Sequence, residues 1–187
     1  MRVFFAVASL LCLLGCSSTT VGPGPNWGTV GGIPFTPVDG FYLLSADQTT
    51  GDYNFTVIAV DTLGYCNVLL QNTAGFLANM NTVTLTYSNP VGTGAFDPPP
   101  GTYPVTAAPG TTATAQASFA SVANCVPTMP IPGTSGSVGL QGVAIDYSQL
   151  LGSLNVTFGT SGGLVGNFTA PLCDISNSPQ GPSTCVQ

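Results

Sequence analysis

The chain of 187 residues has almost no basic side chains. Arg2 is its one Lys or Arg, there is no His, and every acidic residue is an Asp. Nucleic-acid binding is excluded, because phosphates are neutralised by Lys and Arg. Catalytic sites of the Ser-His-Asp or Cys-His type and histidine-ligated zinc sites are excluded because they need an imidazole. Lysine Schiff bases and cationic phosphate clamps are excluded for the same lack of basic residues.

The carboxylates are the remaining candidates for acid–base or metal chemistry. Glycoside hydrolysis needs a pair of them in a cleft, and no spacing in the sequence marks such a pair. A turn bounded by Asp47 and Asp52 could offer oxygen ligands to calcium, but it lacks EF-hand spacing. We therefore expect no catalytic residues, no cofactor and no metal site. The seven Asp residues of the chain are Asp39, Asp47, Asp52, Asp61, Asp97, Asp146 and Asp174.

The N-terminus predicts export. After Arg2, residues 3–14 form an apolar run that is shorter than the ~20 residues of a membrane-spanning helix and fits a signal peptide. The run ends in LLGC (residues 13–16), which resembles the lipobox of bacterial lipoproteins. A plain signal peptide and an N-terminal core helix are the alternatives. We expect residues 1–15 to be removed and Cys16 to carry a diacylglycerol and a palmitate. Ser17, a non-acidic residue, favours the outer membrane.

A tether and one domain are expected after the signal. Residues 16–38 are rich in Gly, Pro, Ser and Thr, and they predict a flexible lipidated tether that holds the domain roughly 25 Å from the membrane. Trp27 is the exception there: it either docks the tether onto the domain, which we favour, or stacks on a sugar. Residues 39–187 predict one β-rich globular domain.

Short β-prone runs separated by turn residues predict an all-β fold. We expect an antiparallel β-sandwich, with a partly closed β-barrel as the alternative. A short helix is predicted near residues 63–72. The first two runs read as a hairpin whose second strand is central, and the last three read as a meander. The runs are residues 40–46, 53–60, 82–88, 101–107, 112–124, 135–146, 151–158 and 163–170.

Four cysteines remain beyond the N-terminal pair, and they predict two disulfides in an exported chain. Sequence proximity favours Cys66–Cys125 with Cys173–Cys185, because the latter closes a short C-terminal loop. The rival pairing joins Cys125 to Cys173 and leaves Cys185 for Cys66. No CxxC spacing is present, so metal ligation by these thiols is not expected.

The C-terminal half carries a wider resemblance. The segments PGTY (residues 100–103), GSLNVTF (152–158) and GNFTAPLC (166–173), with the lone Cys125, resemble predicted lipoproteins of Gram-negative bacteria whose function is mostly unknown. The resemblance covers roughly residues 97–173 and the lipobox. It implies a β-rich, disulfide-containing, membrane-tethered domain, and it carries no catalytic residue over to this chain.

Two functions are compatible with these features. The first is a structural or protein-interaction module that contacts the lipid bilayer through acylated Cys16 and binds an envelope protein. The second is a small binding module for polysaccharide or another ligand that uses exposed aromatics such as Trp27, Tyr42 or Tyr53. Aromatics clustered on an exposed face would favour the second, and buried aromatics beneath a threonine-rich surface would favour the first.

Overall fold

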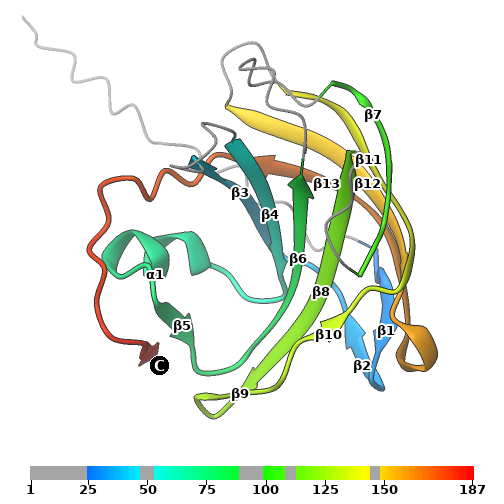
Figure 1. Cartoon of the computed structure of the whole chain (residues 1–187). Helices are drawn as coiled ribbons and strands as arrows, with labels where there is room; N and C mark the ends of the chain where they lie inside the picture. Colours follow the sequence, from blue (N-terminus) through cyan, green and yellow to red (C-terminus); the bar gives the residue numbers. More distant parts are fainter. Residues whose placement is uncertain (1–24, 47–52, 89–98, 108–112, 144–147) are drawn as a thin grey trace, which may run out of the picture.

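The computed structural model describes residues 25–46, 53–88, 99–107, 113–143 and 148–187. Over these ranges the chain forms two six-stranded antiparallel sheets that pack face to face, with one short α-helix on the outside (Figure 1). The predicted all-β sandwich is confirmed.

The first sheet, called sheet A here, contains the C-terminal meander. Its last three long strands follow one another in the chain and pair as neighbours, as predicted. A 3₁₀ turn, Gly159–Ser161, connects the last two of them. The strand order is β2 (Ile33–Phe35), β1 (Gly28–Val30), β13 (Gly162–Pro171), β12 (Gln149–Thr157), β11 (Ser135–Val143) and β7 (Gly101–Pro104).

The second sheet, sheet B, contains the predicted N-terminal hairpin. Its second strand lies between two others, as predicted. Both faces of this strand are apolar because Val57 and Ala59 pack into the core between the sheets, whereas Ile58 and Val60 pack into a second core on the outer side of sheet B. The order is β10 (Ile131–Pro132), β8 (Thr114–Ala123), β6 (Met80–Ser88), β4 (Tyr53–Val60) and β3 (Asp39–Ala46), and β9 (Val126–Pro127) also pairs with β8.

The main core lies between the two sheets. Inward residues alternate with outward ones along each strand, so that Leu154 and Val156 of β12 are buried whereas Asn155 between them is exposed. Single backbone bridges join the sheets at both sides, from Tyr42 to Leu172 and from Val105 to Ala115. Two such bridges do not merge the ladders, so the described strands form a sandwich and not the alternative barrel.

A smaller second core covers part of the outward face of sheet B. The helix α1 (Tyr65–Gln71), the strand β5 (Gly75–Leu77) and the C-terminal strand β14 (Thr184–Val186) form this layer. Leu69 of α1 packs with Phe41, Ile58 and Met80 from the sheet. The helix predicted near residues 63–72 is confirmed.

The expected tether is wrong for residues 25–38. Two short strands, β1 and β2, lie in this range and extend sheet A. Val30 and Phe35 are fully buried, and Trp27 is only 5% exposed. The Gly- and Pro-rich composition concealed these strands, because each is three residues long and shows too little alternation to stand out. The expectation that Trp27 docks onto the domain is confirmed.

Both disulfide pairings considered from the sequence are wrong, although all four cysteines do form disulfides. The bonds join Cys66 to Cys173 and Cys125 to Cys185, with Cα–Cα distances of 6.0 and 5.6 Å. The chain that follows β13 crosses the helical layer, which brings Cys173 against α1. It then pairs β14 with β5, near the turn that holds Cys125. Closeness in sequence was therefore a poor guide to closeness in space.

Candidate interaction surface

Two of the described carboxylates hold the fold together. Asp39 accepts hydrogen bonds from the backbone N–H groups of Gly40 (2.8 Å) and Gly64 (3.0 Å), which ties β3 to the start of α1. Asp61 accepts from the backbone N–H and the side-chain amide of Asn81 at 2.7 and 2.6 Å. Because these oxygens bind local donors, their positions indicate a structural role.

The third described carboxylate, Asp174, lies at the exposed surface beside Ser176. Hydrogen bonds from Ser176 lower the pKa of Asp174 below its usual value. The remaining four, including the Asp47–Asp52 turn considered for calcium, lie outside the described residues. Within the described ranges, no three His, Cys, Asp or Glu side chains gather to hold a metal ion.

Two of the three aromatics proposed as a sugar platform are buried. Trp27 and Tyr42 are 5% and 0% exposed, so the expectation that they offer an exposed stacking face is wrong. Trp27 packs against Phe35 with ring centroids 5.7 Å apart. The side chain of Tyr53 lies outside the described part of the chain. These aromatic rings pack the domain, as expected for the first of the two functions considered.

A buried tyrosine pair lies on the β6 and β7 strands. The rings of Tyr87 and Tyr103 pack edge to face, with centroids 5.3 Å apart. The Tyr103 hydroxyl donates to the Pro99 carbonyl oxygen at 2.6 Å, whereas the Tyr87 hydroxyl is buried without a hydrogen-bond partner. Burial raises the pKa of Tyr87, and the neighbouring Tyr103 raises it further. Both rings lie in the core between the two sheets.

Proline blocks three of the five edge strands of sheets A and B against an added strand. A proline in an edge strand removes one N–H donor, which matters only where that N–H would face outward. Val105, Thr128 and Gly133 each follow such a proline, and their N–H groups donate inward to the sheet. Since N–H direction alternates along an antiparallel strand, Pro104, Pro127 and Pro132 lie at outward-facing positions.

The other two edge strands, β2 and β3, are also protected. Pro34 lies at the middle of the short strand β2, at the end of sheet A. The β3 edge of sheet B is occupied at its middle, where the Cys173 N–H donates to the Tyr42 carbonyl oxygen at 2.9 Å. A partner that pairs strand to strand would find few free donors on the described edges, so the sheet faces are the better candidates for binding.

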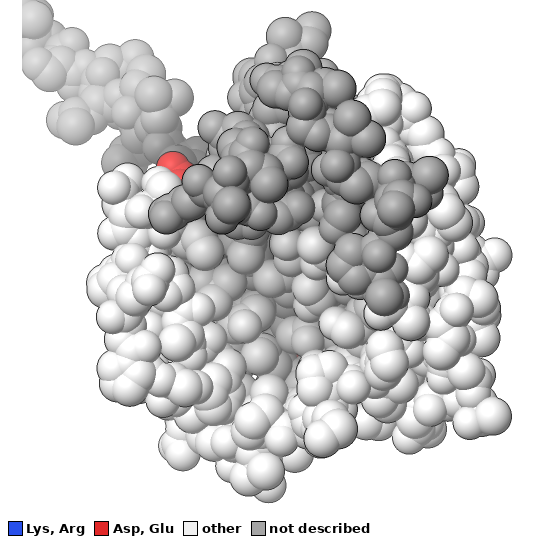
Figure 2. Space-filling view, in the orientation of Figure 1, with Lys and Arg blue, Asp and Glu red and all other residues white. Residues whose placement is uncertain are grey.

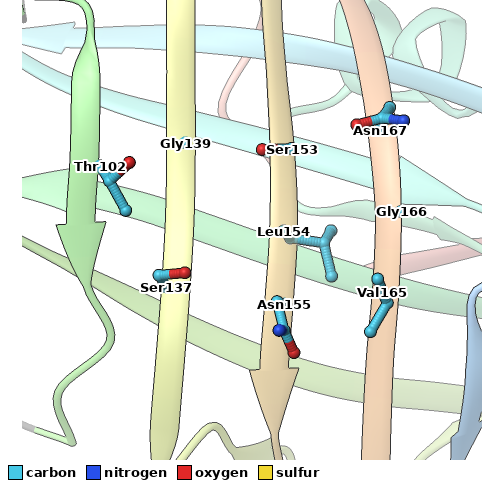
Figure 3. Close-up of a pocket in the computed structure, with 9 residues that line it drawn as sticks. All are labelled: Thr102, Ser137, Gly139, Ser153, Leu154, Asn155, Val165, Gly166 and Asn167. Carbon is cyan, nitrogen blue, oxygen red and sulfur yellow. The ribbon is translucent and has the colours of Figure 1, made fainter.

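A depression lies on the outward face of sheet A (Figure 3). Its volume is about 280 Å³. Gly139 leaves the space open at the centre, since a Cβ there would lie 2.7 Å from the Ser153 hydroxyl oxygen. Thr102, Gly139, Ser153 and Asn167 lie side by side across β7, β11, β12 and β13. Ser137, Asn155 and Val165 line it as well, and none of these side chains is charged.

The second depression lies on the part of sheet B that α1 leaves uncovered. It has a volume of about 200 Å³ and is lined by Thr84, Thr86, Gln116 and Ser118, among others. In Figure 2 the visible described surface is almost entirely uncharged, with one small acidic spot at its upper left. The residues that line the two depressions include hydroxyl and amide side chains and no charged one.

The polar residues on the face of sheet A follow from the alternation along its strands. Ser137, Ser153, Asn155 and Asn167 are the polar positions that alternate with buried ones in runs already predicted as strands. Alternation identified the outward positions, but no single residue type distinguished a binding face from an ordinary solvated one.

Comparison with known proteins assigns this chain to no family. No family model matches it, and neither the curated proteins nor the solved structures contain a significant match. Across the described ranges no helix has the length and apolar character needed to cross a bilayer.

Proposed function

We propose that this protein is a cell-envelope lipoprotein, anchored through Cys16 in the outer membrane, whose β domain serves as a protein-interaction module. The observation that carries the proposal is the broad uncharged face of sheet A, built from Ser, Thr and Asn side chains on rigid strands. Two disulfides stabilise the domain that presents this face.

The distribution of polar and aromatic groups favours this function over the alternatives. Asp39 and Asp61 bind backbone donors, so they are not poised for acid–base chemistry. Trp27 and Tyr42 are buried and offer no stacking surface to a sugar. A rigid polar face supplies hydrogen bonds to a protein partner, and interface centres are typically depleted of charge.

The length of the tether follows from the fold. The described domain begins at residue 25, so only residues 17–24 separate it from Cys16. Eight residues span at most roughly 30 Å even when fully extended. A tether that reached residue 38 could extend to more than twice that length, so the fold limits how far the domain can lie from the bilayer.

Binding of a neutral polysaccharide is the second candidate, favoured by the depression at Gly139 alone. Its hydroxyl and amide groups can exchange hydrogen bonds with sugar hydroxyls, and the absence of charge among its lining residues fits an uncharged ligand. Val165 supplies the one exposed apolar contact on this rim.

Site-specific photocrosslinking in cells tests the proposed function. A photoreactive residue at Asn155 samples the face of sheet A, and one at Thr84 on sheet B is the matched control. We expect one envelope protein to be captured reproducibly from Asn155, not from Thr84, and to be lost in the Cys16→Ser variant. Membrane-bound protein that captures no protein from Asn155 would contradict the interaction module. Wild-type protein that fractionates away from membranes would contradict the anchor.

A further inference from the structure

The loop between β9 and β10 exposes apolar side chains at one end of the sandwich. Met129 is 89% exposed and Val126 is 65% exposed, the two highest values among the large hydrophobic residues described. Pro127 and Pro130 accompany them, and Thr128 is the only polar residue between positions 126 and 130. We call residues 126–130 the apolar tip.

Hydrogen bonds and a disulfide hold the apolar tip in its exposed position. The Thr128 N–H donates to the Ser121 carbonyl oxygen at 2.8 Å, and the Thr128 hydroxyl oxygen accepts from the Ser121 N–H at 3.1 Å. Just before the tip, Cys125 is joined to Cys185, and its N–H donates to the Ala78 carbonyl oxygen at 2.9 Å. Exposure of Met129 is thus built into the fold, and binding through it would cost little ordering entropy.

The charge distribution favours an uncharged, apolar partner surface. No charged residue occurs from position 98 to position 145, which includes the whole tip. The chain beyond Arg2 has no basic residue, so electrostatic attraction cannot draw the domain to anionic headgroups. Contact with a bilayer would therefore depend on apolar side chains, and the tip is where the most exposed of them lie.

The start of the described chain lies within reach of the tip. The turn between β1 and β2 packs beside the tip, since a Cβ on Gly31 would lie 3.4 Å from Cδ1 of Ile131, which lies just after residues 126–130 (Figure 1). The six residues from Gly31 back to residue 25 span at most about 20 Å, and residues 17–24 can extend to roughly 30 Å. A lipid on Cys16 can therefore reach the bilayer beneath this end of the sandwich.

We propose that the apolar tip docks into the interfacial layer of the membrane that holds the lipid anchor, with Met129 and Val126 among the lipid headgroups. This inference rests on the proposed anchoring through Cys16. Docking by the end of the sandwich stands the strands upright and leaves the face of sheet A directed sideways, accessible to a partner in the same membrane.

Brominated-lipid quenching of tryptophan fluorescence tests the docking. The full-length lipidated protein is reconstituted into vesicles of phosphatidylethanolamine and phosphatidylglycerol with brominated acyl chains. Trp27, the only native Trp, is buried and gives a constant background. We expect the Met129→Trp variant to lose most of its added fluorescence, with no change between low and high salt. The control is Val165→Trp, which places a Trp at a position that is 63% exposed on sheet A, and it should not be quenched.

The outcomes separate the docking from the anchor. Unquenched Met129→Trp in protein that floats with the vesicles would overturn the docking and leave the anchor intact. Equal quenching of both variants would also overturn it, because the domain would then lie on its face. Protein that fails to float, or that floats equally well as Cys16→Ser, would overturn the proposed anchor. Quenching confined to Met129→Trp supports the tip, and flotation that is lost with Cys16→Ser supports the anchor.

Discussion

Replacing Gly166 with Ala should destabilise the domain through Trp27. A Cβ at this position would lie 2.5 Å from Cδ1 and Cε2 of the indole and closer still to Nε1. The main chain that carries the ring is held on both sides, since the Trp27 backbone N–H donates to the Phe35 carbonyl oxygen at 2.9 Å and the Trp27 carbonyl oxygen accepts from the Val165 backbone N–H at 2.8 Å. The ring itself packs against Phe35 and is only 5% exposed, so it has little room to move. Overpacking of this kind costs about 1–3 kcal/mol, or a fall in Tm of about 2–12 °C for a chain of this size.

Tryptophan emission during denaturant unfolding reports this effect directly, because Trp27 is the only Trp in the chain. The matched control is Gly101→Ala, where the nearest atom to an added Cβ is 3.7 Å away. In a Trp27→Leu background, followed by circular dichroism, Gly166→Ala should cost much less, because the clash is with the indole.

Two results would refute this reasoning. One is a Gly166→Ala protein whose stability lies within about 0.5 kcal/mol of wild type, the ordinary effect of a neutral substitution. The other is an equal cost of Gly166→Ala in the wild-type and Trp27→Leu backgrounds. Either would mean that residues 25–27 do not pack on β13, and that the tether is as long as the sequence suggested.

Three further predictions concern the core and the disulfides. Tyr87→Phe should leave the free energy of unfolding unchanged or raise it by about 1–3 kcal/mol, because it removes an unpaired buried hydroxyl. Tyr103→Phe should lower the free energy of unfolding by about 1 kcal/mol, because it removes the hydrogen bond to Pro99. Thermal melts compare the two variants, and a large loss of stability in Tyr87→Phe would contradict the packing. Because burial raises the pKa of Tyr87, the unfolded state releases the Tyr87 hydroxyl proton at a lower pH than the folded state. The free energy of unfolding should therefore fall as pH rises above about 10, and it should fall less steeply in Tyr87→Phe. Denaturation at pH 8–11 measures the slope of stability against pH, and equal slopes for the two proteins would be evidence against the burial. Non-reducing peptide mapping of the purified, folded protein should find Cys66 linked to Cys173 and Cys125 to Cys185. A Cys66–Cys125 peptide as the main product from that folded protein would exclude the C-terminal path described.

The strands could be predicted from sequence because their signal is local. The pleat of a strand makes Leu154, Val156 and Phe158 alternate with polar neighbours, so the sequence of each strand predicts which of its side chains face inward. The short helix gives a weaker local signal, since Val68 and Leu69 are buried whereas the equally apolar Leu70 is 41% exposed.

The disulfides and the first strands could not be predicted because they depend on distant contacts. Cys173 lies beside Cys66 because the backbone of Leu172 bridges to that of Tyr42, and no local sequence pattern predicts that bridge. The burial of Trp27 depends on Gly166, whose missing side chain leaves room for the indole.

The candidate surfaces were the least predictable part. Ser153 and Asn167 look like any solvated strand residue until the register places them in one row with Gly139. Met129 has the opposite difficulty: it is apolar, so the expectation from sequence is burial, and only the fold shows that it stays exposed.

The crossed order of the disulfides has a consequence for biosynthesis. A chain that enters an oxidising compartment from its N-terminus presents Cys66 first and Cys125 second, with both native partners still to come. The earliest bond that oxidation can make between these cysteines is therefore a non-native one, and wherever it forms it has to be broken by thiol–disulfide exchange before the domain is complete. We expect a strain that has an oxidase but no isomerase to accumulate more of the protein in the Cys66–Cys125 form than a strain that has both.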